Sequence, residues 1–120
     1  MGFLDRIRNQ GAPTTPQETD QLVLRQLTAR GADLTKPRHV IHYLYFADES
    51  DARGAADLIE QAEWDTTVSP PDEKIVDWSL QAEGYRVIGT ATVEAFRAWF
   101  EQIAAEYEAE YDGWEASAKP

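Results

Sequence analysis

The chain has 120 residues, with 22 acidic against 11 basic side chains, a formal net charge of −11 and no cysteine. The absence of cysteine excludes disulfides, thiolate zinc sites and a cysteine nucleophile, and it suits a reducing cytoplasm, where we expect the protein to be located. The acidic balance argues against direct binding to nucleic acid, which normally needs a basic surface, and no apolar run approaches the roughly 20 residues of a membrane span.

The first predicted element is a helix that begins near Thr15. Thr15 can cap the helix, Pro16 suits its first turn, and Glu18 stands where a capping box places an acid. The helix should end near Arg30, because the following Gly31 can adopt the left-handed conformation that commonly terminates helices.

A strand and a second helix follow. Val40–Phe46 is dense in β-branched and aromatic residues, which predicts a strand, and its nearly continuous apolar character suggests burial on both faces. Asp48 then opens a helix that should run to about Ala62, with Leu58, Ile59 and small alanines on its inner face.

The second half of the chain continues with two extended segments, a helix and a strand. Trp64–Ser69 is predicted to be a short strand and Lys74–Ile88 a longer extended segment. Thr90 can cap a third helix, and Tyr111–Ala116 is expected to form the last strand. The third helix has an apolar stripe at spacings of three or four residues, formed by Val93, Phe96, Phe100, Ile103 and Tyr107.

This order predicts one α+β domain over residues 15–116, with residues 1–14 as a flexible leader and residues 117–120 as a tail. After the first helix the order is β-α-β-β-α-β. It is most simply satisfied by a ferredoxin-like antiparallel sheet with both later helices on one face. The extra N-terminal helix would then cover an edge or the open face of the sheet.

No catalytic or metal-binding pattern stands out. His39 and His42, the two histidines, point to opposite faces of the predicted strand and so make a poor metal pair. Each is expected to be a structural residue, with a general base as the alternative. The serines lack a nucleophile motif, and Gly84 and Gly89 lack the spacing of a phosphate-binding loop. We therefore expect no enzymatic activity, no cofactor and no metal.

Acidic residues concentrate in two segments. Residues 48–63 hold six acids and one base, and residues 101–115 hold six acids and no base. Two interpretations stay open: solvated helix faces that keep the protein soluble, and an acidic patch that steers a basic partner. Tyr111 and Trp114 are either interface anchors or core residues. The candidate protein-binding residues are Asp48, Glu49, Asp51, Asp57, Glu101, Glu106, Glu108, Glu110, Tyr111, Asp112 and Trp114.

Three stretches carry a resemblance to a known family. The first is Leu27–Asp33 ahead of the strand His39–Phe46, and the second is the helix Ala52–Glu63 leading into Trp64–Val68. The third and most specific is Glu110–Trp114, with the sequence Glu-Tyr-Asp-Gly-Trp, directly after a long amphipathic helix. In this order and spacing the chain resembles the regulators of ribonuclease E activity of the B type (RraB), bacterial inhibitors that act by protein–protein binding.

The resemblance implies a regulator that docks on ribonuclease E, or on a related ribonuclease with a basic segment, and inhibits RNA cleavage. The acidic helical face would engage that basic segment, with no direct contact to nucleic acid or membrane. The alternative is a small-molecule-binding ferredoxin-like domain with no ribonuclease target.

Overall fold

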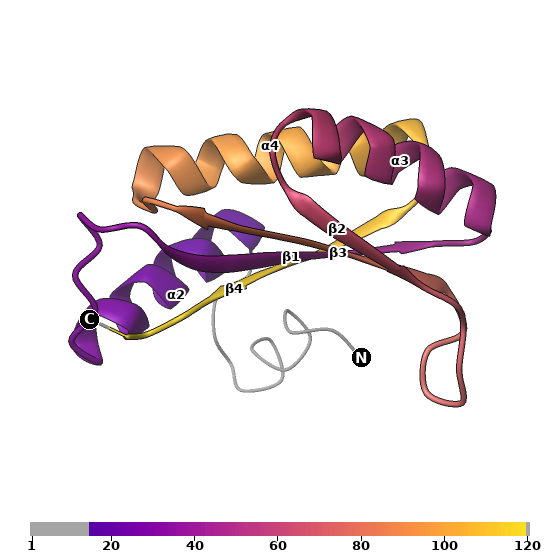
Figure 1. Ribbon diagram of the computed structural model, residues 1–120. Coiled ribbons are helices and arrows are strands. Elements are labelled where there is room, and N and C mark those ends of the chain that lie inside the picture. Colours follow the sequence, from indigo (N-terminus) through magenta and orange to yellow (C-terminus); the bar gives the residue numbers. More distant parts are fainter. Residues whose placement is uncertain (1–14, 120) are drawn as a thin grey trace.

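A computed structural model describes residues 15–119, so the leader predicted for residues 1–14 lies outside the described residues. Helices and strands follow one another in the predicted order (Figure 1), although most boundaries differ by a few residues. The elements are α2 (Pro16–Ala29), β1 (Arg38–Phe46), α3 (Glu49–Gln61), β2 (Asp65–Ser69), β3 (Trp78–Arg86), α4 (Thr90–Glu106) and β4 (Glu110–Ala116).

The four strands form one antiparallel sheet in the order β2-β3-β1-β4. Both α3 and α4 cover the same face of this sheet, and α2 packs against α4 (Figure 1). The structure therefore confirms the predicted α+β class, and its order of elements is consistent with a ferredoxin-like arrangement preceded by an extra helix.

The longer strand expected from Lys74 begins only at Trp78. The preceding residues form a turn, in which the Asp72 carboxylate accepts hydrogen bonds from the backbone amides of Lys74 and Ile75, both at 2.8 Å. Such side-chain bonds give the backbone an alternative to strand pairing, which explains the shorter strand.

Burial in β1 alternates along the strand. Side chains at every second position from Arg38 to Phe46 are buried, and those between them are partly exposed. The expectation that both faces would be buried is therefore wrong. Among residues 15–119, helices cover only one face of this antiparallel sheet, so one row of strand side chains forms the core.

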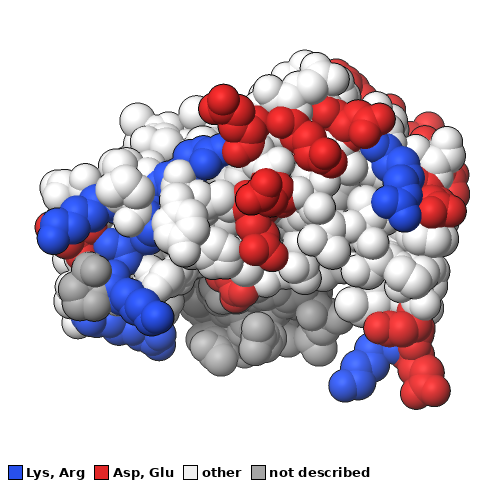
Figure 2. Space-filling view, in the orientation of Figure 1, with Lys and Arg blue, Asp and Glu red and all other residues white. Residues whose placement is uncertain are grey.

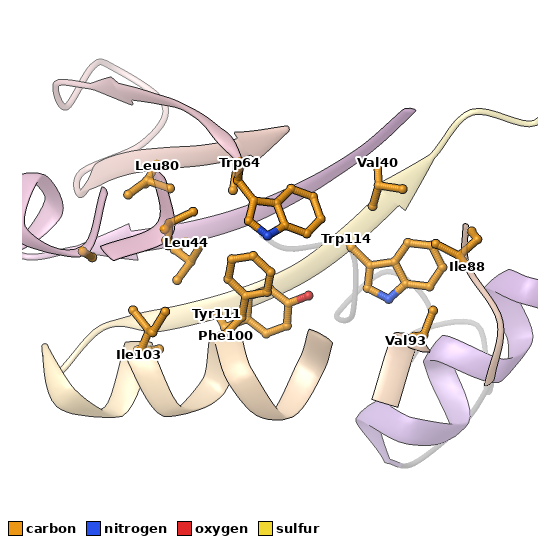
Figure 3. Close-up of a cluster of buried hydrophobic side chains, with 14 of the residues drawn as sticks. Val40, Leu44, Trp64, Leu80, Ile88, Val93, Phe100, Ile103, Tyr111 and Trp114 are labelled. Atoms are coloured by element: carbon orange, nitrogen blue, oxygen red, sulfur yellow. The ribbon is translucent and has the colours of Figure 1, made fainter. Parts of the chain in front are cut away.

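The core lies between the sheet and the helical layer (Figure 3). Phe100 of α4 stacks on Tyr111 of β4 with ring centroids 5.5 Å apart, and Trp64 meets the edge of Phe100 at 5.7 Å. Aromatic pairs in such geometries stabilise by more than their buried area alone. These contacts hold β4 against the middle of α4.

Two details of the predicted helices are wrong. Leu58 does not belong to the inner face of its helix but is 38% exposed. Thr90 is the first residue of α4 and not its cap; the N-cap is Gly89, and the Thr90 hydroxyl donates to Gln21 of α2 at 3.1 Å. The inner face of α3 is formed by Ala52, Ala55, Ala56 and Ile59, so the positions predicted for Ile59 and the small alanines are confirmed.

A β-bulge accounts for the distinctive sequence Glu110–Trp114. Asp112 is the extra residue where the register between β4 and β1 shifts, and Gly113 has a φ of 104°, which favours glycine. In a regular strand Tyr111 and Trp114 would face opposite sides of the sheet. The bulge turns both rings toward the core, where they are 8% and 4% exposed.

A buried carboxylate joins α2 to α4 and β4. Asp20 accepts hydrogen bonds from Arg97 Nε at 2.6 Å, Arg97 Nη2 at 2.9 Å and Trp114 Nε1 at 2.8 Å. Burial alone would lower the pKa of Arg97, but its hydrogen bonds to Asp20 and Glu101 outweigh burial and raise that pKa. The guanidinium therefore stays charged inside the protein. We call the three residues Asp20, Arg97 and Trp114 the Asp20 node.

We expect Asp20→Asn to lower the free energy of unfolding by about 3–5 kcal/mol, because it leaves a buried guanidinium without its carboxylate. Glu49→Gln is the control, since it breaks an exposed pair with Arg53 and should cost less than about 1 kcal/mol. Urea unfolding measures both. Equal losses in the two variants would contradict the importance of the node.

Candidate functional site

The two acidic segments meet at one end of the molecule. Glu110 of β4 pairs with Tyr45 near the end of β1. Tyr107, the C-cap of α4, contacts Phe46 with ring centroids 6.4 Å apart and lies directly against Gly54 of α3. The N-terminal half of α3 therefore lies beside the C-terminal end of α4. The carboxylates gathered here, which we call the acidic end, belong to Asp48, Glu49, Asp51, Glu106, Glu108 and Glu110.

Negative charge at this end is poorly compensated. Figure 2 shows acidic side chains spread over the helical layer, whereas most basic side chains in this view lie at the opposite end. Arg53 is already hydrogen-bonded to Glu49 at 3.2 Å. The pKa of Tyr45 is raised by burial and then by the charges of Asp112 and Glu110. A cation approaching this end would meet an attractive potential.

The three helices end differently. After α2, Gly31 adopts a φ of 91°, whereas the corresponding residues after α3 and α4 are Glu63 at 68° and Glu108 at 52°. A residue other than glycine costs roughly 1–2 kcal/mol in this left-handed region, and the helix dipole further disfavours an acid there. Both glutamates are therefore held at the expense of local stability.

The other predicted site residues are distributed elsewhere. Asp57 is exposed near the middle of α3, and Glu101 lies partway along α4, where it accepts a hydrogen bond from Arg97 at 2.9 Å. The surface position expected of Tyr111 and Trp114 as interface anchors is wrong, because both rings are buried. Core packing, the alternative for these two residues, is confirmed.

A small groove between α3 and α4 is a feature that the sequence patterns do not predict. Trp99 lies outside the apolar stripe of α4, and its ring meets the neighbouring Phe100 edge to face at 4.9 Å. The only sequence signal is a large aromatic residue next to a stripe position. The groove has a volume of about 170 Å³ and is lined by Leu58, Trp99, Gln102, Ile103 and Glu106.

The two histidines lie on opposite faces of β1, as predicted. His39 is partly exposed and lies 3.1 Å from the carboxylate of Glu83. His42 is buried among aromatic rings, stacks on Phe100 at 4.1 Å, and has Nδ1 2.7 Å from the Tyr111 hydroxyl. Such a buried ring has no route to a substrate, which supports the structural role expected for it.

Stability should depend on the protonation of His42. Burial, with the positive charges of Arg97 and Arg86, lowers the pKa of His42 to about 3. Below pH 6.5 the unfolded chain binds a proton there that the folded protein does not, so stability should fall as the pH decreases toward 3.

We expect this fall to reach about 1.4 kcal/mol per pH unit below pH 6, measured by urea unfolding between pH 7 and pH 5. In His42→Phe the slope over that range should largely disappear. The His39→Gln variant, which leaves His42 in place, should retain it. A full slope in His42→Phe would contradict the assignment.

Within residues 15–119, no group of three or more His, Asp or Glu side chains is arranged to hold a metal ion. The helices in that range are all too short or too polar to cross a membrane.

Comparison with known proteins agrees with the sequence resemblance. A family model described as regulator of ribonuclease activity B (RraB) matches residues 17–116, which extend from the first turn of α2 to the end of β4. The curated proteins contain no significant match to the chain. Because the family model covers most of its length, this chain belongs to the RraB family of regulators of ribonuclease activity.

Proposed function

We propose that the protein binds ribonuclease E, or a related ribonuclease, through the acidic end and thereby lowers the cleavage of RNA. Its family supports a regulatory role toward a ribonuclease, and hence a protein partner. The contacts of Tyr107 with Phe46 and Gly54, which bring two distant acidic segments together, are the observation that carries the choice of surface.

Charge complementarity supplies a physical mechanism. An enzyme that holds RNA must present Lys and Arg side chains to the phosphate backbone. Clustered carboxylates can bind the same cations and so compete with RNA for them. Exposed charges are screened over a Debye length of about 8 Å at physiological salt, so the carboxylates must lie close together to act jointly. The contacts of Tyr107 with Phe46 and Gly54 bring the two acidic segments to the same end of the molecule and so support this mechanism.

The position of Glu108 adds a second argument. A glycine there would be more stable, because it accepts the left-handed conformation and carries no charge at the helix C-terminus. Functional residues are commonly retained at such a cost to stability. Glu108 therefore lowers local stability, and its retention is expected if its carboxylate contacts a partner.

Reversing the charge of the acidic end tests the proposal. In the triple variant Glu106→Lys, Glu108→Lys and Glu110→Lys, we expect the affinity for full-length ribonuclease E from the host to fall by at least about tenfold. The dependence of affinity on salt should flatten, because fewer ion pairs form. Calorimetric titration at two salt concentrations, with RNA cleavage followed in parallel, measures both effects.

A matched triple, Glu60→Lys, Glu63→Lys and Glu94→Lys, gives the same net charge at the opposite end of the helical layer. Its affinity should change much less. If both triple variants lost the same affinity, the effect would depend on net charge alone, and the proposal of a defined binding surface would be contradicted. If the unaltered protein does not bind at micromolar concentrations, the ribonuclease target is wrong and the small-molecule-binding alternative takes its place.

Single glycine variants separate stability from binding. Glu63→Gly and Glu108→Gly should each raise the free energy of unfolding by about 0.5–1 kcal/mol, because both residues have positive φ. Only Glu108→Gly should weaken binding to the ribonuclease. Thermal unfolding and calorimetry on the two variants provide the comparison, and equal binding by both would exclude a role for the Glu108 carboxylate.

A further inference from the structure

The groove between α3 and α4 is an apolar opening within an acidic layer. Leu58 and Trp99 line it, and so does Glu106 of the acidic end. Leu58 is 38% exposed, although a neighbouring residue of the same helix, Ile59, is completely buried. The exposed leucine and the partly buried tryptophan, which packs on Phe100 of the core, therefore leave an apolar surface open between the two helices.

The volume of the groove matches one large side chain. A cavity of about 150 Å³ in a protein core binds a single benzene molecule. The groove, at about 170 Å³, therefore has room for one leucine or phenylalanine side chain. An aromatic wall such as Trp99 is the kind of residue on which interface anchors pack.

The charges of the helical layer decide what kind of partner fits. The two bases of α3 and α4 are each hydrogen-bonded to acids: Arg53 to Glu49, and Arg97 to Asp20 and Glu101. No basic residue lines the groove. An acidic partner would therefore meet unbalanced negative charge, whereas a basic partner would be attracted.

We infer that this groove receives one large apolar side chain from a basic segment of the partner, while Lys or Arg residues of that segment contact the acidic end. The inference rests on the proposed function and assigns the surface that recognises the segment. Charge attracts many basic segments without distinguishing them, and the groove adds a requirement for an apolar residue.

The geometry sets the spacing of that segment. Trp99 and Glu106 are seven residues apart on α4, which corresponds to about 10 Å along a helix. A partner would span this distance with seven residues of helix or about three residues of extended chain. The apolar anchor and the nearest basic residue should therefore be separated by one of these two intervals.

Two synthetic peptides test the inference. Both are rich in Lys and Arg, have the same net charge, and differ only in a central Leu or Ser placed at the predicted interval from a basic residue. We expect the Leu peptide to bind the full chain about tenfold more tightly, as burial of one leucine side chain allows. Calorimetry measures affinity, and the indole NMR signal of Trp99 reports whether the groove is occupied.

Variants of the protein test whether the preference for the Leu peptide arises at the groove. Leu58→Ser should abolish the preference for the Leu peptide while leaving affinity for the Ser peptide unchanged. Val87→Ser is the matched control, because Val87 is a similarly exposed apolar residue, at 46% against 38%, outside the groove. Leu58 is not part of the buried core, so its replacement should leave the fold intact, which circular dichroism can verify.

The outcomes are distinguishable. If both peptides bind equally and the Trp99 signal does not move, the groove inference is wrong, while binding through the acidic end stands. If neither the peptides nor the ribonuclease binds, the proposed function itself fails and the groove inference with it. If Leu58→Ser instead changes the mass of the protein in sedimentation, the groove is a contact between two copies, and the inference is overturned.

Discussion

The Asp20 node is the interaction on which the arrangement of the helical layer depends. One carboxylate accepts hydrogen bonds from two nitrogens of Arg97 and from the indole nitrogen of Trp114, and so joins α2, α4 and β4. The side chains of Arg97 and Asp20 are only 3% and 2% exposed. A buried charge is tolerated only when such partners are in place. The node holds α4 in place at Arg97. The C-terminal half of α4, which carries Glu106 of the acidic end, therefore has a defined direction relative to the sheet.

The most distinctive residues of the sequence serve the fold and not a binding surface. Gly113 permits the bulge that turns Tyr111 and Trp114 inward, and Trp114 then completes the Asp20 node. A sequence motif of this kind identifies the family because it specifies a backbone geometry. Recognition of a partner must therefore be sought in residues with no conspicuous motif, such as the glutamates at the end of α4 and the leucine and tryptophan beside them.

Sequence patterns predict well where neighbours along the chain decide the outcome. Thr15 and Asp48 cap their helices by accepting hydrogen bonds from the amide three residues later, at 3.1 and 2.9 Å. The patterns fail where contacts between residues far apart in the sequence determine which side chains are buried. Asp20 and Arg97 are 77 positions apart, and charged helix residues are normally solvated, so no local signal indicates their burial. The exposure of Leu58 likewise follows from the position of α4 beside α3.

In the binding mode proposed above, crowded carboxylates and an apolar groove would have complementary roles. Like charges at the acidic end repel one another in the free protein, and Glu108 is additionally held in a conformation that favours glycine. A basic segment would relieve this repulsion, so the residues that lower stability when free would contribute affinity when bound. Such attraction is long-ranged and weakly directional. A groove of fixed shape acts only at contact, and Trp99 lies a fixed distance from Glu106 on one rigid helix. Charge would therefore determine the rate at which basic segments associate, and the groove would determine which of them dissociates slowly.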